Sequence, residues 1–238
     1  MVSYTRISPN TSGIRTSQIS KVIVHHMAGD CSVEVCGEIF ANPNRQASSN
    51  YGVGSDGRVA CYLEEEYHPW TTSSYWADDR GVTIEVADYD LDAWSPSSAA
   101  YESTVLLCAD ICDRYGITPS YTGDTDGTFV EHRMFASTSC PGPWWHDRMP
   151  AFIEDVKAAM RGEFDMTLDE LLNDKLATAD DGQVPIWQLW SWAFTHARRA
   201  EKKCDDILAR IDKVQAGNVD YAALAKAVCD EQAKRMKA

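Results

Sequence analysis

The sequence lacks the features that would place the chain in a membrane. Its longest apolar run, IWQLWSWAF at 186–194, is interrupted by Gln and Ser, whereas a membrane-spanning helix needs about 20 apolar residues. The N-terminal segment MVSYTRISPNTSG has no basic stretch followed by an apolar core, so it does not resemble a signal peptide. We therefore expect a protein that is made in the cytoplasm and is not inserted into a membrane.

Basic residues are also scarce. The formal net charge is −14, and residues 1–160 hold 10 Lys+Arg against 22 Asp+Glu. A protein that binds nucleic acid needs a basic face to neutralise phosphates. The acidic N-terminal part therefore argues against nucleic acid as a partner, and the negative charge is explained by solubility alone.

Cysteine is present, but not in a pattern that predicts a disulfide framework or a zinc ribbon. The eight cysteines are spread over the chain, unlike the dense spacing of small secreted domains. Cys108 and Cys112 lie four residues apart in a helical stretch, and Cys31 and Cys36 flank the start of another. We expect both pairs to be buried free thiols; a Cys31–Cys36 disulfide is the alternative.

Residues 1–162 alternate strand-like and helical segments. The β-branched run KVIVHH (21–26) predicts a buried strand, and GVTIEVAD (81–88) predicts another. The segment 50–63, NYGVGSDGRVACYL, predicts a hairpin around Asp-Gly. Helices are predicted over 33–42, 97–115 and 147–161. These elements predict an α/β domain with a mixed central β-sheet flanked by helices.

The C-terminal part has a different pattern. Residues 163–185 predict a short helix and a linker, and residues 186–238 predict a helical, coiled-coil-like region. Within it we predict a heptad helix over 186–216 and a terminal helix over 219–236. The heptad positions are Ile186, Trp190, Ala193, Ala197, Ala200, Cys204, Ile207, Ile211 and Val214. This apolar seam must be buried, either in a homo-oligomer or against other helices of the same chain.

Three residues form a candidate metal site. His25 lies at the end of the run KVIVHH, one residue before its last, and His132 and Cys140 lie eight residues apart in EHRMFASTSCPG. Two imidazoles and one thiolate suit Zn²⁺ and leave a fourth tetrahedral position for water, which is typical of a hydrolytic site. Taken alone, a histidine at the end of a strand is more often a satisfied core residue than a ligand.

Glu85 is the candidate general base. It lies in the middle of VTIEVAD among apolar residues, where a carboxylate is costly unless it is paired or used. One interpretation is a salt bridge to Arg80 or Arg133. The other, which we favour, is a base whose raised pKa suits it to take a proton from a water activated by zinc.

Four stretches together resemble the zinc-dependent N-acetylmuramoyl-L-alanine amidases of the amidase-2 class, a group that includes peptidoglycan recognition proteins and phage or prophage endolysins. They are KVIVHHMAG, SSNYGVGSDGRV, VTIEVAD and EHRMFASTSCPG, and the resemblance covers about residues 15–160. It implies a mixed sheet flanked by helices with one Zn²⁺ per catalytic domain in an open cleft. It also implies His25, His132 and Cys140 as the zinc ligands.

The resemblance further implies catalytic and substrate-binding positions, with some departures. Where some relatives carry a catalytic tyrosine this chain has Ser49, so the acid–base role falls to Glu85. Where many carry a lysine two residues before the last ligand it has Thr138, whose hydroxyl would donate to the developing oxyanion. The expected substrate-binding residues are Asn50, Tyr51, Trp70, Thr71 and Trp144. Tyr75, Trp76 and Trp145 complete an aromatic set that would line a groove for glycan and peptide; the alternative is that half of the set is core or structural rim.

The implied function is that of an endolysin: hydrolysis of the amide between N-acetylmuramic acid and L-alanine in bacterial peptidoglycan. Such an enzyme would be made in the host cytoplasm and would reach the cell wall after release, in a holin-dependent manner. Two alternatives stay open. One is a peptidoglycan-binding protein of the same fold without catalysis, against which the presence of Cys140 argues. The other is a zinc peptidase that cuts the stem peptide.

Overall fold

The computed structural model describes residues 2–164. Its strands are β1 (Val2–Thr5), β2 (Thr11–Ile14), β3 (Lys21–His26), β4 (Tyr51–Val53), β5 (Val59–Cys61), β6 (Tyr67–Pro69), β7 (Gly81–Val86) and β8 (Phe129–Glu131). Its α-helices are α1 (Val33–Ala41), α2 (Tyr75–Asp78), α3 (Ser98–Tyr115) and α4 (Pro143–Met160), and short 3-10 helices cover Pro43–Arg45 (η1) and His132–Met134 (η2).

Six strands form the central sheet in the order β1-β5-β4-β7-β3-β8. The four strands β4, β7, β3 and β8 are parallel to one another, whereas β5 pairs with β4 in antiparallel fashion and β1 is parallel to β5. Strands β2 and β6 form a separate antiparallel pair. The predicted mixed sheet is therefore confirmed.

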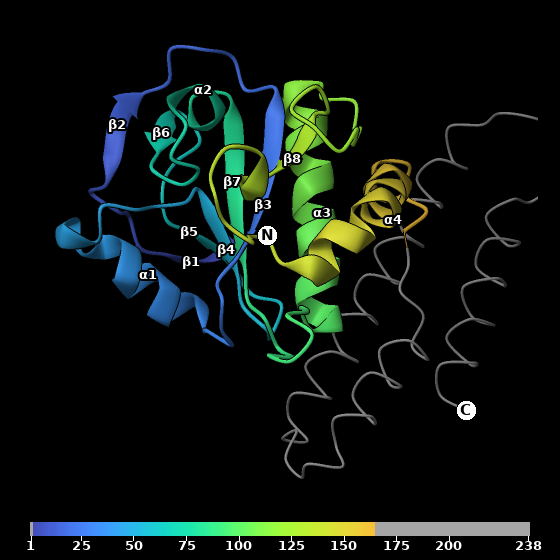
Figure 1. Cartoon of the computed structure of the whole chain (residues 1–238), viewed down its shortest axis with the longest axis horizontal. Coiled ribbons are helices and arrows are strands. Elements are labelled where there is room, and N and C mark those ends of the chain that lie inside the picture. Colours follow the sequence, from blue (N-terminus) through green and yellow to red (C-terminus); the bar gives the residue numbers. More distant parts are fainter. Residues whose placement is uncertain (1, 165–238) are drawn as a thin grey trace, which may run out of the picture. The chain divides into compact units, whose positions relative to one another are not determined.

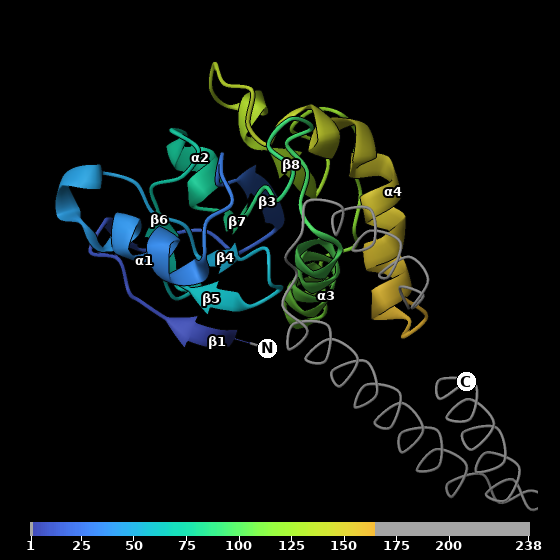
Figure 2. The same ribbon diagram turned by 90° about the horizontal axis from the view of Figure 1, so that it is seen from below.

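Helices cover both faces of the sheet. In Figures 1 and 2, α3 and α4 lie on one side of the sheet, and α1 and α2 lie on the other. The larger apolar core fills the space between the sheet and the pair α3 and α4, with α3 contributing Val105, Leu107, Cys108, Ile111 and Cys112 and α4 contributing Trp145, Met149, Phe152, Ile153 and Val156. Two smaller clusters lie on the side of α1 and α2.

The alternation of side chains along β3 and β7 places the polar residues on one face. Val24 and Ile84 pack into the larger core, so their neighbours His25 and Glu85 point to the opposite face, that of α1 and α2. His25 and Glu85 are direct partners in the parallel register of β3 and β7. The fold therefore brings together an imidazole and a carboxylate that are far apart in the sequence.

The predicted elements agree with the structure at most boundaries. The strand 21–26 and the hairpin of β4 and β5 are observed, and α3 ends at Tyr115, where Gly116 adopts φ 64° and caps the helix. Helix α4 begins at Pro143, four residues before the predicted start, because a proline is well suited to the first turn of a helix. Strands β1, β2, β6 and β8 and helix α2 were not predicted; each has only three or four residues.

The cysteine expectations can be checked where the structure describes them. Cys36, Cys108 and Cys112 are buried and free, as expected, and Cys31 is free but half-buried, so no Cys31–Cys36 disulfide is formed. Among residues 2–164, no helix combines the length and the apolar character needed to cross a membrane. The predicted heptad helix 186–216 and terminal helix 219–236, and all but the first two residues of the segment 163–185, lie outside the described residues.

Candidate metal centre

The candidate ligands come from the carboxyl ends of parallel strands. His25 is the fifth residue of β3, and His132 follows β8 directly as the first residue of η2. Strands β3, β7 and β8 are parallel, so their carboxyl ends meet at one edge of the sheet, which is where ligands bind in open α/β sheets. Cys140 returns to this edge because its carbonyl accepts a hydrogen bond from the backbone N–H of Arg133 (3.0 Å).

The three side chains converge as predicted. One ligand atom from each of His25, His132 and Cys140 lies within 4.8 Å of the others. The Sγ atom of Cys140 is 3.5 Å from Nδ1 of His25, and the imidazole centroids of His25 and His132 are 4.7 Å apart. Among residues 2–164 this is the only such group of three His, Cys, Asp or Glu side chains.

This geometry fits a zinc ion. With Zn–S about 2.3 Å and Zn–N about 2.0 Å, a tetrahedral angle places sulfur and nitrogen about 3.5 Å apart, which matches the separation of Cys140 Sγ and His25 Nδ1. The Nε2 atoms of His25 and His132 are buried and have no hydrogen-bond partner. Buried polar atoms are almost always satisfied, so unpaired imidazole nitrogens beside a thiol support a metal site.

The protonation states also favour a cation. Burial lowers the pKa of His25 well below its ordinary value and also lowers that of His132, so both rings are neutral at pH 7, the form that binds a metal. Burial, with the nearby carboxyl of Glu85, raises the pKa of the Cys140 thiol, while the backbone N–H of His26 opposes that rise. A bound divalent cation reverses the effect, because a coordinating thiol is deprotonated.

Glu85 lies beside this group on β7. Its side chain keeps a narrow contact with solvent but is otherwise surrounded by protein. Burial raises the pKa of Glu85 to about 8, the negative charge of Asp88 adds to the rise, and Arg45 opposes it. The alternative of a salt bridge to Arg80 or Arg133 is wrong for this structure: among residues 2–164 neither cation lies within 4.0 Å of Glu85, and Arg80 lies 4.0 Å from Asp79 instead.

Comparison with known proteins agrees with this geometry. The sequence model of the N-acetylmuramoyl-L-alanine amidase family matches residues 15–143, which contain all three candidate ligands and Glu85. The chain belongs to this family. The amidase is thus a peptidoglycan hydrolase, as the sequence motifs predicted. No curated protein sequence matches the chain significantly.

Solved structures share the fold of the amidase. A mutant of PlyL is 15% identical, with a TM-score of 0.54 over 66% of this chain and 99% of that chain. A mutant endolysin from Bacillus subtilis is 16% identical, with a TM-score of 0.53 over 66% and 99% of the two chains. The Staphylococcus aureus hydrolase AmiA, in complex with its ligand, is 17% identical, with a TM-score of 0.53 over 67% and 85%.

Thr138 lies at the exposed rim of the metal group. Its hydroxyl oxygen accepts a hydrogen bond from the backbone N–H of Cys140 at 3.2 Å. That bond occupies a lone pair and leaves the hydroxyl proton available for donation. Thr138 therefore supports the backbone that presents Cys140, and its position is compatible with the predicted contact to an oxyanion.

Trp70 and Thr71 lie on the side of the sheet that carries the metal group. The Trp70 indole is 37% exposed and its Nε1–H donates to Ser12. The hydroxyl of Thr71 donates to the backbone carbonyl of Ser48 (2.7 Å). The backbone of the next residue, Thr72, raises the pKa of His132 against the larger effect of burial. The segment 70–72 therefore borders the metal centre.

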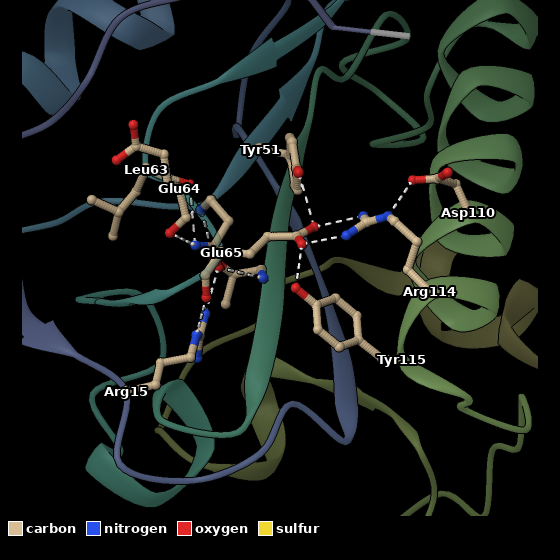
Figure 3. A network of polar contacts seen from close by, with 10 residues as sticks. Arg15, Tyr51, Leu63, Glu64, Glu65, Asp110, Arg114 and Tyr115 are labelled. Atoms are coloured by element: carbon tan, nitrogen blue, oxygen red, sulfur yellow. Dashed lines mark hydrogen bonds and ion pairs between the residues drawn. The ribbon is translucent and has the colours of Figure 1, made fainter.

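Two predicted substrate-binding residues are placed elsewhere. Asn50 is completely buried, and its amide bonds to Arg15, to the backbone of Thr83 and to two backbone carbonyls. Tyr51 is the register partner of Ile84 and so points to the α3 face of the sheet, away from Glu85. Figure 3 shows its hydroxyl directed at Glu65, to which it donates at 2.8 Å. The prediction of substrate contact is not supported for either residue, because one is enclosed and the other faces the opposite layer.

The aromatic set divides into exposed, half-buried and core members. Trp145 is fully buried in the larger core. Trp144 is half-buried beside Tyr101, with the Arg148 guanidinium 5.5 Å from its ring. Tyr75 and Trp76 are exposed on α2. Trp144 thus packs with the helices behind the sheet, whereas the exposed aromatic residues lie on the metal side.

A separate hollow of about 540 Å³ is lined by Ile14, Arg15, Ser17, Gln18, Ile19, Glu65, Glu66, Arg114 and Tyr115. None of these residues belongs to the metal group. Two of its charged side chains pair with each other: Glu65 accepts hydrogen bonds from Arg114, and also from Tyr51 and Tyr115, as Figure 3 shows. This hollow is therefore explained by the structure of the fold and not by the chemistry of the site.

Sequence reasoning missed two residues that shape the metal centre. The Asp88 carboxylate lies 3.0 Å from Nδ1 of His26 and raises the pKa of Glu85. The backbone of Thr72 raises the pKa of His132, against the larger effect of burial. The only available signal for Asp88 was its position at the end of VTIEVAD. No motif pointed to Thr72, since its effect comes from the backbone.

Proposed function

We propose that His25, His132 and Cys140 bind one Zn²⁺ and that the amidase uses it to hydrolyse the bond between the lactyl group of N-acetylmuramic acid and L-alanine. The observation that carries this proposal is the convergence of the three ligands with Glu85 at one sheet edge. A zinc ion bound there would polarise the amide carbonyl and lower the pKa of a water molecule towards about 7.

Glu85 would act as general base and then general acid. It lies on the face of the sheet that carries His25, and it has no competing ion pair within 4.0 Å among the described residues. The raised pKa makes the ionised carboxylate a stronger proton acceptor, and a zinc ion bound beside it would favour that ionised form. It takes the proton of the attacking water and returns it to the amine of L-alanine as the amide bond breaks.

Residues at the rim would hold the substrate. The Thr138 hydroxyl would donate to the carbonyl oxygen as negative charge develops on it. The Trp70 indole, with its exposed surface beside Thr71, would contact sugar or peptide. Of the five substrate-binding residues expected from the sequence, we retain Trp70 and Thr71 in this role, and Trp144 remains a weaker candidate because it packs behind the sheet.

We also propose that the enzyme acts as an endolysin. It would be made in the host cytoplasm and would reach the wall through a holin-dependent route. The segment 163–185 would link the catalytic domain, 1–162, to the helical region 186–238, and the heptad helix 186–216 would form a homo-oligomer. We propose no nucleic-acid partner, because the catalytic domain is acidic.

Mass spectrometry of digested peptidoglycan tests the reaction. Free glycan strands with complete stem peptides, each beginning with an unblocked L-alanine, support the amidase reaction. Peptides cut within the stem would instead identify a zinc peptidase.

Metal content and turnover of two variants test the roles of Cys140 as a zinc ligand and of Glu85 as the general base. We expect Cys140→Ser to lose zinc, and Glu85→Ala to keep zinc and lose turnover. Glu154→Ala, on the exposed side of α4, is the control.

A further inference from the structure

The residue before His132 is a carboxylate without solvent contact. Glu131 is the last residue of β8 and is 0% exposed. Phe129 packs into the larger core and Val130 into a cluster on the opposite side of the sheet. Side chains alternate along a strand, so Glu131 points towards the layer of α3 and α4, away from the metal group. A carboxylate in such a place is costly unless its oxygens are bonded, and it takes no part in the proposed reaction.

Two side chains from separate elements bond to Glu131. Nδ1 of His146, near the start of α4, lies 3.0 Å from one carboxylate oxygen and 3.2 Å from the other. The hydroxyl of Tyr121, in the connection between α3 and β8, donates to the same carboxylate. A carboxylate only accepts hydrogen bonds, so Nδ1 of His146 carries the proton in this pair.

The pair closes the segment that carries two of the three candidate ligands. Glu131 and His146 lie at the ends of this segment, with His132 directly after the first and Cys140 six residues before the second. Within the segment, the backbone N–H of Arg133 donates to the carbonyl of Cys140 at 3.0 Å. The two ligands therefore lie in a loop whose ends are joined by a hydrogen bond between side chains.

The strand that leads into this loop has little other support. Strand β8 has three residues and lies at the edge of the sheet, and within the described part of the chain it pairs only with β3. Helix α4, in contrast, is held by Trp145, which is fully buried in the larger core. The bond between Glu131 and His146 therefore ties the end of an edge strand, and with it the backbone of His132, to a firmly packed helix.

We propose that Glu131 and His146 are positioning residues for the metal centre: their pairing holds the carboxyl end of β8 against α4 and so fixes the placement of His132 relative to Cys140. This inference rests on the proposed zinc site. Ligands that are already in place bind an ion without the cost of ordering the loop. Loss of the pair should therefore weaken zinc binding even in a chain that stays folded.

His146 allows the pair to be broken without disturbing the core, because its side chain is 44% exposed. His146→Leu removes the donor, whereas His146→Asn keeps an N–H close to the position of Nδ1 and should restore the bond. Glu131→Gln tests the other partner, because it keeps the shape of the side chain but replaces one acceptor oxygen with a donor group.

A carboxylate elsewhere on α4 provides the matched control. Asp155 accepts a hydrogen bond from the hydroxyl of Tyr101, as Glu131 does from Tyr121. It lies nine residues further along α4 than His146, outside the loop that carries the ligands. Asp155→Ala therefore removes a bond between a tyrosine and a carboxylate without touching the pair.

Two measurements on the full-length chain test the role. Competition with a chromophoric chelator gives the zinc dissociation constant, and the visible spectrum of the cobalt(II)-substituted protein reports the geometry of the ligands. Thermal unfolding establishes that each variant is folded. We expect His146→Leu and Glu131→Gln to weaken zinc binding by about 10-fold and to change the cobalt spectrum, and His146→Asn to recover most of the affinity. Asp155→Ala should lose thermal stability but keep the zinc affinity and the cobalt spectrum of the wild type.

Each outcome has one meaning. Wild-type zinc affinity and cobalt spectrum in both His146→Leu and Glu131→Gln would overturn the positioning role and leave the proposed zinc site standing. The same holds for a loss that His146→Asn does not restore, or for an equal loss in Asp155→Ala. A wild-type chain that binds no zinc overturns this inference and the proposed function together. Weaker binding confined to the two variants that break the pair, with recovery in His146→Asn, supports the inference.

Discussion

Replacing Glu85 with Gln should stabilise the metal-free enzyme at neutral pH. Burial raises the pKa of Glu85 from 4.5 to about 8, so between these values the folded chain keeps a proton that the unfolded chain has released. The free energy of unfolding of the wild type therefore falls as the pH rises through this window. Glutamine does not ionise, so Glu85→Gln lacks this penalty.

The size of the effect follows from the shift. At pH 7 the penalty covers about 2.5 pH units, each equivalent to about 1.4 kcal/mol, which gives about 3 kcal/mol. The narrow solvent contact of Glu85 reduces this, and we expect about 2–3 kcal/mol. At pH 4.5 the two proteins should differ little, because folded wild type and Glu85→Gln are then both neutral at this position.

Urea unfolding in the presence of a chelator, at pH 4.5, 6 and 7.5, measures the difference. Glu154→Gln is the control, because Glu154 is exposed on α4, and its effect should be small at every pH. A constant difference between wild type and Glu85→Gln across this range would show that the carboxyl is not strained by burial. A less stable Glu85→Gln at pH 7.5 would refute the reasoning outright.

Three further predictions concern the metal and the C-terminal region. Zinc binding at pH 6.5 should release about two protons from the wild type, one from the Cys140 thiol and one from Glu85, and about one proton from Glu85→Gln. Calorimetry in buffers of different ionisation enthalpy counts the released protons. Equal release from both proteins contradicts the raised pKa of Glu85. Asp88→Asn should lower the pKa of Glu85, because Asp88 helps to raise it; a carbon NMR titration of the metal-free protein that shows no downward shift opposes this. Full-length protein should sediment as an oligomer and residues 1–162 as a monomer, and identical monomeric behaviour dismisses the role of the heptad helix.

The residues that sequence reasoning located correctly share a local signal. His25 and Glu85 each interrupt an apolar strand, and a polar side chain in such a place must be paired or used. The sequence could not show that these two residues pair directly across β3 and β7. The order of strands in a sheet depends on the route of the connections between them, and no local sequence pattern records that route. The grouping of His132 and Cys140 with His25 was predicted from their ligand chemistry and was also implied by the family resemblance.

The two predicted substrate contacts that the structure does not support have a physical explanation as well. Asn50 and Tyr51 were expected to contact substrate because they lie in a motif with other functional residues. Adjacent residues of a strand point to opposite faces, and Tyr51 faces α3, while Asn50 precedes β4 and is enclosed by a polar network. Strands of three or four residues, such as β6 and β8, are too short for alternation to identify them, yet they place Trp70 and His132.

The central claim is that two imidazoles and one thiolate bind a single zinc ion with one position left for water. X-ray absorption at the zinc edge of the full-length enzyme tests it most directly. We predict one sulfur at about 2.3 Å and three nitrogen or oxygen atoms at about 2.0–2.1 Å, with the sulfur absent from any zinc that Cys140→Ser retains. A zinc shell without sulfur, or one with two or more sulfurs, would contradict the account.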